Sequence, residues 1–203
     1  RAGATAVGDL RLVYGTTMFL ISTTADFLRA DTLWSTVGVA PGTRNLAGGM
    51  ATSGAITSWL NGLYGEPGFA TLVDEAGASP PGANGLLMLP YFAGERTPIA
   101  DPNARGIIAG LTIGHTRGDI YRAALEATAF GVRHNIEAMR SAGAEIERIV
   151  AVGGGTQGGL WTQIVSDITG ITQIVPRRTI GASYGMAYLA ATTQTAVDIE
   201  SWN

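Results

Sequence analysis

Three glycine-containing segments have residue types that could bind phosphate groups, and the turn Tyr14–Thr17 is the first. Gly15 separates two runs of alternating apolar residues there. Glycine lets the backbone approach a ligand closely, and adjacent N–H groups together with the hydroxyls of Thr16 and Thr17 can hold phosphate oxygens. An ordinary hairpin turn explains the same residues. The turn therefore indicates a phosphate site only if other segments join it.

The second segment, Gly153–Gly159, follows an apolar run typical of a strand and precedes a predicted helix. This order brings bare backbone to a helix N-terminus, where nucleotides bind. From Gly153 it matches G-x-G-x-x-G, the dinucleotide fingerprint, but that fold needs further strand–helix units and an acidic residue about twenty positions on. One short strand remains here, and it ends at Arg177 and Arg178. Since arginine at that place is typical of NADP binding, an NADP-dependent oxidoreductase stays open as an alternative.

Other reactive residue types give weaker indications. His115 and His134 lack metal-ligand spacing, so they predict no metal site. Asp101 is predicted to organise its loop. Arg96 could hold a phosphate, but an ion pair with its neighbour Glu95 is the simpler interpretation. A third glycine segment, 181–185, opens the last predicted helix, and its small residues favour close packing.

Composition excludes several classes of protein. Of 203 residues, 46% are hydrophobic and 14% charged, which excludes a disordered chain. A net charge of -3 gives no electrostatic footprint for nucleic acid or a membrane surface, and no apolar run is long enough to span a bilayer. The chain has no Cys and no Lys. Thiolate chemistry, a Walker-type phosphate loop and Schiff-base chemistry are therefore excluded, and we expect a cytoplasmic protein.

Hydrophobic periodicity predicts a mixed α/β domain. Ile56, Trp59, Leu60 and Leu63 are expected on one face of their helix. In the longest helix, Phe130 is expected to share one face with other apolar residues such as Ala127. Thr116 and Asp119 form a predicted capping pair. The expected strands are 9–14, 18–21, 43–47 (ended by Gly48 and Gly49), 86–91, 106–111, 146–152 and 172–175, and the expected helices are 52–63, 67–76, 119–141, 160–169 and 181–192.

One pair of segments closely resembles the second signature of the FGGY carbohydrate kinases. The pair is Gly106–Leu111 and, after seven residues, Asp119–Glu126. The surrounding segments Leu89–Pro98 and Asp101–Gly106 resemble the xylulokinase branch of that family.

Two further segments match the family in the expected order. The turn Tyr14–Thr17 resembles its second phosphate loop, and Gly153–Gly170 resembles its adenosine motif. The resemblance implies an actin-like ATPase (ribonuclease-H-like) fold with a mixed sheet and flanking helices. It also implies that residues 1–203 form the C-terminal, nucleotide-side domain of a two-domain enzyme, the sugar-binding N-terminal domain lying outside this chain.

The resemblance further implies ATP and Mg²⁺ as cofactors and a small sugar as substrate. Where relatives often carry a polar residue this chain has Gly158 and Gly159, which leaves two alternatives: the side-chain contact is lost, or Gln157 supplies it. The ATP-binding residues carried over from the family are Gly15, Thr16, Thr17, Gly54, Thr57 and Ser58 (beside Trp59), together with Gly154, Gly155, Thr156, Gln157 and Gly158.

No catalytic residue is predicted within the chain. The family's catalytic Asp lies shortly before the hairpin, nothing before Gly15 matches it, and Asp9 is not assigned that role. The isolated chain is therefore expected to be inactive. The expected reaction of the intact enzyme is phosphorylation of a ketose or polyol, with D-xylulose to D-xylulose 5-phosphate the leading case and a homodimer left open. A sugar-independent actin-like ATPase and a non-catalytic interaction module are the remaining alternatives.

Overall fold

A six-stranded mixed sheet forms the centre of the molecule. The structure is a computed structural model that describes residues 4, 6–177 and 182–195. The sheet has the order β3-β4-β2-β1-β7-β8, and β5 and β6 form a separate two-stranded sheet. The strands are β1 (Asp9–Tyr14), β2 (Met18–Thr24), β3 (Trp34–Val37), β4 (Arg44–Met50), β5 (Leu87–Leu89), β6 (Ile107–Ala109), β7 (Arg148–Gly153) and β8 (Gln173–Ile174).

The hairpin of β1 and β2 organises this sheet. Leu10, Leu12 and Tyr14 alternate along β1 and are fully buried on one face, as the period of two predicts. β1 pairs antiparallel with β2 on one side and parallel with β7 on the other, so that Tyr14 lies opposite both Met18 and Gly153. The predicted mixed α/β fold is therefore confirmed, and its central strand ends at the glycine turn.

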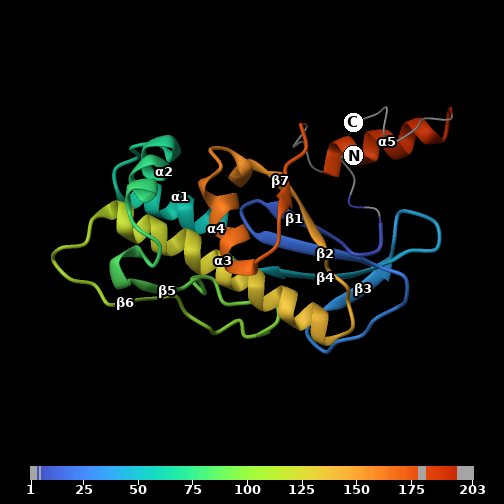
Figure 1. Ribbon diagram of the computed structural model, residues 1–203, viewed down its shortest axis with the longest axis horizontal. Coiled ribbons are helices and arrows are strands. Elements are labelled where there is room, and N and C mark those ends of the chain that lie inside the picture. The colour runs from blue at the N-terminus through green and yellow to red at the C-terminus, as the bar shows by residue number, and fades with distance from the viewer. Residues whose placement is uncertain (1–3, 5, 178–181, 196–203) are drawn as a thin grey trace.

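Helices cover the buried face of the sheet. The long helix α3 packs against β2 and β4 as well as α1, α2 and α4. In Figure 1 α3 crosses below the sheet, whereas α5 lies above it. Thr116 and Asp119 form the predicted capping box of α3. The helices are α1 (Gly54–Leu63), α2 (Phe69–Ala78), α3 (Arg117–Ser141), α4 (Leu160–Thr169) and α5 (Ala182–Thr192), with 3₁₀ turns η1 (Ala83–Gly85) and η2 (Gly154–Thr156). The predicted last-helix residue Gly181 lies outside the described residues.

Gly48 and Gly49 do not end a strand, contrary to the sequence prediction. β4 continues through both to Met50. A Cβ on Gly48 would lie 2.8 Å from Asn135 Oδ1, and one on Gly49 would lie 2.7 Å from the Met18 carbonyl oxygen. These glycines therefore permit close packing against neighbouring segments instead of breaking the strand. The sequence analysis also missed β3, which pairs with β4.

The predicted faces of two helices are wrong in part. Ile56 and Leu60 of α1 are buried as expected, but Trp59 and Leu63 are exposed. Phe130 of α3 is also exposed. Apolar periodicity marks these positions but does not report what covers them: the Trp59 ring lies against Phe92 with the centroids 5.2 Å apart, and Phe130 lines a cavity between α3 and α4. Within the described residues, no helix combines the length and apolar character needed to cross a membrane.

Candidate functional site

At one end of the sheet, three segments that are far apart in sequence meet: the turn Tyr14–Thr17, the segment Gly153–Gly159 and the start of α1 at Gly54. The parallel register of β1 and β7 places Tyr14 beside Gly153. On the other side of the turn, the N–H of Gly54 donates to the Gly15 carbonyl at 2.9 Å. A Cβ on Gly54 would lie only 2.6 Å from that oxygen, so α1 can approach the turn this closely only with glycine there. The structure thus brings together three segments that the resemblance to the FGGY family predicts to bind ATP.

The start of α1 fixes the orientation of the turn. The N–H groups of Ser53 and Ala55 donate to the Thr16 carbonyl at 3.1 and 3.0 Å, while Gly54 binds the Gly15 carbonyl. In a trans peptide the C=O and the following N–H point in opposite directions. The N–H groups of Thr16 and Thr17 therefore point away from α1. Both residues are exposed, and these two N–H groups have no hydrogen-bond partner within the described part of the chain.

The helix N-terminus itself is not available for a ligand in the usual way. The amides of Gly54 and Ala55 are already bonded to the turn. Thr57 is buried and donates to the Gly54 carbonyl, whereas Ser58 is exposed one position further along. The buried hydroxyl of Ser53, the N-cap, has no partner in the described structure. Ser53 was not predicted because the predicted helix, 52–63, begins before it, although Ser is a residue type typical of the N-cap position.

Gly153 and Gly155 pack tightly against Tyr14. Gly153 has φ +104°, and a Cβ there would lie 2.4 Å from the Tyr14 carbonyl oxygen, so no other residue fits without a backbone shift. A Cβ on Gly155 would meet Tyr14 and Trp161 at 2.9 Å, whereas Gly154 faces open space. This bare backbone beside the turn leaves room for a ligand at Gly154.

The remaining predicted residues follow directly in this segment. Thr156 donates its hydroxyl to the Gly153 carbonyl at 2.8 Å. Gln157 and Gly158 are exposed, and a Cβ on Gly158 would lie 3.6 Å from Val73 of α2. The segment therefore extends from the hairpin turn towards α2.

Tyr14, the residue before the turn, is held by contacts of its buried side chain. Its hydroxyl donates to Gln173 Oε1 at 2.8 Å, and its ring lies edge-on to Trp161 with the centroids 5.4 Å apart. Burial raises the pKa of Tyr14 well above its ordinary value, so the phenol stays neutral. Trp161 in turn donates to Thr128 Oγ1 at 3.0 Å. The turn therefore rests on a buried hydrogen-bonded framework.

The expected ion pair between Glu95 and Arg96 is not formed. The Glu95 carboxylate accepts the N–H groups of Ala51 and Arg96 at 2.8 and 2.7 Å, and the Arg96 guanidinium donates to the Met50 carbonyl. Burial raises the pKa of Glu95, an effect that these two N–H donors partly oppose. The pair fails because neighbouring side chains on an extended segment point to opposite sides. Both residues instead hold the end of β4.

The predicted structural roles of Asp101 and His115 agree with their contacts. Asp101 accepts the N–H of Asn103, and His115 Nδ1 accepts the N–H of Thr112. His134 is exposed. In the part of the chain that the structure describes, no three carboxylate or imidazole groups lie close enough together to hold a metal ion.

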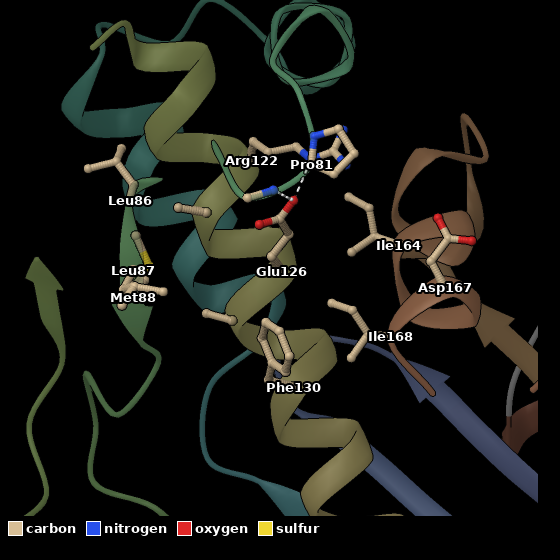
Figure 2. Close-up of a pocket in the computed structure, with 13 residues that line it drawn as sticks. Pro81, Leu86, Leu87, Met88, Arg122, Glu126, Phe130, Ile164, Asp167 and Ile168 are labelled. Atoms are coloured by element: carbon tan, nitrogen blue, oxygen red, sulfur yellow. Dashed lines mark hydrogen bonds and ion pairs between the residues drawn. The ribbon is translucent and has the colours of Figure 1, made fainter. Parts of the chain in front are cut away.

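A cavity of about 260 Å³ lies elsewhere, between α3, α4 and the segment around β5. Figure 2 shows the apolar side chains of Leu86, Ile164 and Ile168 around it, with Glu126 at its wall. Glu126 accepts from Arg122 at 2.7 Å and from the Gly82 N–H at 3.0 Å. This cavity shares no lining residue with the glycine segments, and we therefore place the candidate site at the turn.

The mixed sheet, with its hairpin beside a parallel pair, defines an α/β domain of the actin-like ATPase type. A model of the FGGY family of carbohydrate kinases, C-terminal domain, matches residues 10–193. The chain therefore belongs to this family, and the sequence-based expectation of the family is confirmed. The mixed sheet also argues against the doubly wound parallel sheet that an NADP-dependent oxidoreductase would need.

Individual relatives are xylulose and glycerol kinases. A xylulose kinase of Staphylococcus epidermidis is 36% identical over 152 residues, which are 74% of this chain and 31% of that protein. A glycerol kinase of Citrifermentans bemidjiense is 34% identical over 195 residues, 93% of this chain and 39% of that one. The crystal structure of xylulose kinase from Rhodospirillum rubrum superimposes with a TM-score of 0.86 at 33% identity, covering 96% of this chain and 40% of that one. The chain thus spans well under half the length of these relatives.

Proposed function

We propose that this chain is the ATP-binding half of a kinase that transfers the γ-phosphoryl group of ATP to a hydroxyl of a ketose or polyol. The observation that carries the proposal is the pair of outward-facing N–H groups at Thr16 and Thr17, held by α1 and flanked by the open backbone of Gly154. Fixed backbone donors of this kind stabilise negative charge on phosphate oxygens without reorganising. D-xylulose is the leading substrate because xylulose kinases are among the relatives, and glycerol is the second candidate.

The residues at the turn fit a nucleotide phosphate better than a metal ion. Residues 15–17 and 153–157 contain glycine, hydroxyl and amide groups but no carboxylate. Mg²⁺ prefers oxygen ligands that include carboxylates and phosphates, so Mg²⁺ would arrive with the nucleotide and supply charge neutralisation there. The chain's own part is to bind and orient the phosphates by backbone N–H groups, since phosphoryl transfer depends mainly on position and electrostatics.

The catalytic base and the sugar contacts are proposed to lie in an N-terminal domain outside this chain. The relatives are more than twice as long as the matched segment. Of the described carboxylates, none lies in residues 14–17, 53–58 or 153–159. The isolated chain should accordingly bind ATP without turning it over. A cytoplasmic location and a homodimer accompany this proposal as predictions.

Two measurements test the proposal. The 203-residue chain should bind ATP in isothermal titration calorimetry, and NADPH should not displace it. The complete gene product should release ADP only with a sugar or polyol, in a panel of pentuloses, glycerol and other polyols. ADP release that is indifferent to every sugar would favour the actin-like ATPase, and sugar-dependent release by the 203-residue chain alone would refute the assignment of half an enzyme.

A further inference from the structure

We infer that the loop Glu95–Thr97 is a positioning element of the nucleotide site, which it fixes by holding the end of β4 in place. The inference rests on the proposed function, because it assigns a role in ATP binding. The loop touches neither the turn nor the glycine segments directly in any hydrogen bond of the described structure. Its effect would pass through β4 and the start of α1.

Thr97 completes an edge of the sheet that β3 leaves open. β3 pairs with β4 only as far as Ala47, so the outer edge of the next residues lacks a strand partner. The N–H of Thr97 donates to the Gly49 carbonyl at 3.2 Å, and the N–H of Gly49 donates to Thr97 Oγ1 at 2.6 Å. Thr97 therefore satisfies both backbone groups of Gly49 as a neighbouring strand would.

Glu95 and Arg96 hold the two residues that follow. Arg96 Nη2 donates to the Met50 carbonyl at 2.7 Å, and Ala51 N–H donates to Glu95 Oε1 at 2.8 Å. Gly49, Met50 and Ala51 are thus each bonded to the loop. Three consecutive residues held by side chains leave the end of this strand little freedom to fray.

The loop is itself fixed to the longest helix. Asn135 of α3 is completely buried and donates to the Thr97 carbonyl at 2.9 Å, while the Thr97 hydroxyl lies 2.6 Å from Asn135 Oδ1. Asn135 also donates to the Gly131 carbonyl of its own helix at 2.9 Å. These bonds therefore fix the end of β4 relative to α3, the helix that packs under the sheet.

Two residues, Thr52 and Ser53, connect the end of β4 that the loop holds to the start of α1 beside the turn. After Ala51, Thr52 donates its hydroxyl to the Pro90 carbonyl, and Ser53 begins the contacts with the turn. Only these two residues therefore separate Ala51, the last residue bonded to the loop, from Gly54, which binds the Gly15 carbonyl. Because that bond aims the Thr16 N–H outward, a shift of the strand end should change the direction of the phosphate donors.

The test compares two Thr→Val variants of equal burial in the 203-residue chain. Thr97→Val removes the hydroxyl of the loop. Thr24→Val removes the hydroxyl that binds the Asp26 carbonyl at the far end of β2, about 20 Å along the strand from the turn. Affinity for ATP is measured by calorimetry well below both melting temperatures. We expect Thr97→Val to weaken ATP binding about fivefold to tenfold, Thr24→Val to stay within about twofold, and Thr97→Ser to restore tight binding.

Each outcome decides a different point. Equal affinities in the Thr97→Val and Thr24→Val chains would show that the loop is merely structural and would overturn the inference. No ATP binding by the unaltered chain would instead refute the proposed function. If Thr97→Val does not fold, Arg96→Met replaces it, because Arg96 is exposed. Hydrogen exchange of the Ser53, Gly54 and Ala55 amides should then become faster, and unchanged exchange would overturn the inference.

Discussion

Replacing Gly54 with alanine tests whether the close contact between α1 and the hairpin turn organises the proposed phosphate site. The added Cβ would lie 2.6 Å from the Gly15 carbonyl oxygen, a backbone atom of the central hairpin. To reach ordinary contact near 3.4 Å the two atoms must move apart by about 0.8 Å. A movement of that size breaks or lengthens the three hydrogen bonds that join Ser53, Gly54 and Ala55 to the turn.

The magnitude follows from those bonds. Each is worth about 0.5–1.5 kcal/mol net, so losing two costs about 1–3 kcal/mol. Alanine regains at most about 1 kcal/mol of helix propensity. With that full gain taken off, the net loss is about 0–2 kcal/mol, which lowers the melting temperature of a domain of this size by up to about 8 °C. Since the Thr16 and Thr17 donors lose their orientation, ATP affinity should fall about tenfold.

Gly62→Ala is the matched control in the same helix, because a Cβ there meets nothing within 4 Å. It should raise the melting temperature by about 1–4 °C through helix propensity and leave ATP affinity unchanged. Thermal unfolding followed by circular dichroism and ATP titration of both chains provide the comparison. If Gly54→Ala is as stable as Gly62→Ala and binds ATP equally well, the close contact between α1 and the turn does not organise the site.

Two further experiments test stabilising contacts of side chains that lie away from the turn. The Ser79 hydroxyl, with the Thr116 N–H and hydroxyl, holds the pKa of Asp119 below its ordinary value of 3.8, so the stability that this carboxylate adds is present above that pH and lost as pH falls below it. The difference in melting temperature between the unaltered chain and Asp119→Asn should thus be constant from pH 7 to 5 and shrink near pH 3, and an unchanged difference at pH 3 would contradict this. Glu126→Leu leaves the buried charge of Arg122 without its partner and should lower the free energy of unfolding by about 3 kcal/mol, measured by urea unfolding. The double variant with Arg122→Met should recover most of that loss. A double variant less stable than Glu126→Leu would show that these side chains stabilise the chain by more than their mutual charge compensation.

Local signals in the sequence were sufficient to predict most of the helices and strands. The hairpin followed from alternation around Gly15, and Thr116 with Asp119 marked the start of α3 through a capping box that the structure contains. The predicted bounds of α4, residues 160–169, are those observed. Each of these features depends on residues within a few positions of one another, which is the range over which sequence patterns carry information.

The errors have a common physical cause. Gly48 and Gly49 are compatible with a strand break and with close packing, and only the positions of Asn135 and Met18 decide for packing. Likewise, the apolar stripe of α1 predicts burial, but Trp59 is exposed and has its ring beside Phe92, a residue distant in sequence. Both cases depend on segments distant in sequence, which periodicity does not report.

Not all the residues that reveal the family are proposed to bind the nucleotide. Asp119 belongs to the segment that resembles the FGGY signature, yet its carboxylate accepts from Ser79, Asn84 and Thr116 and so fixes the start of α3. The proposed phosphate donors depend instead on contacts between Gly15 and Gly54 that no sequence pattern reports. The two sets should therefore differ in one readout: Asp119→Asn should lower stability while ATP affinity stays unchanged, whereas Gly54→Ala should lower both. A loss of ATP affinity in Asp119→Asn would mean that the signature segment acts on the site itself.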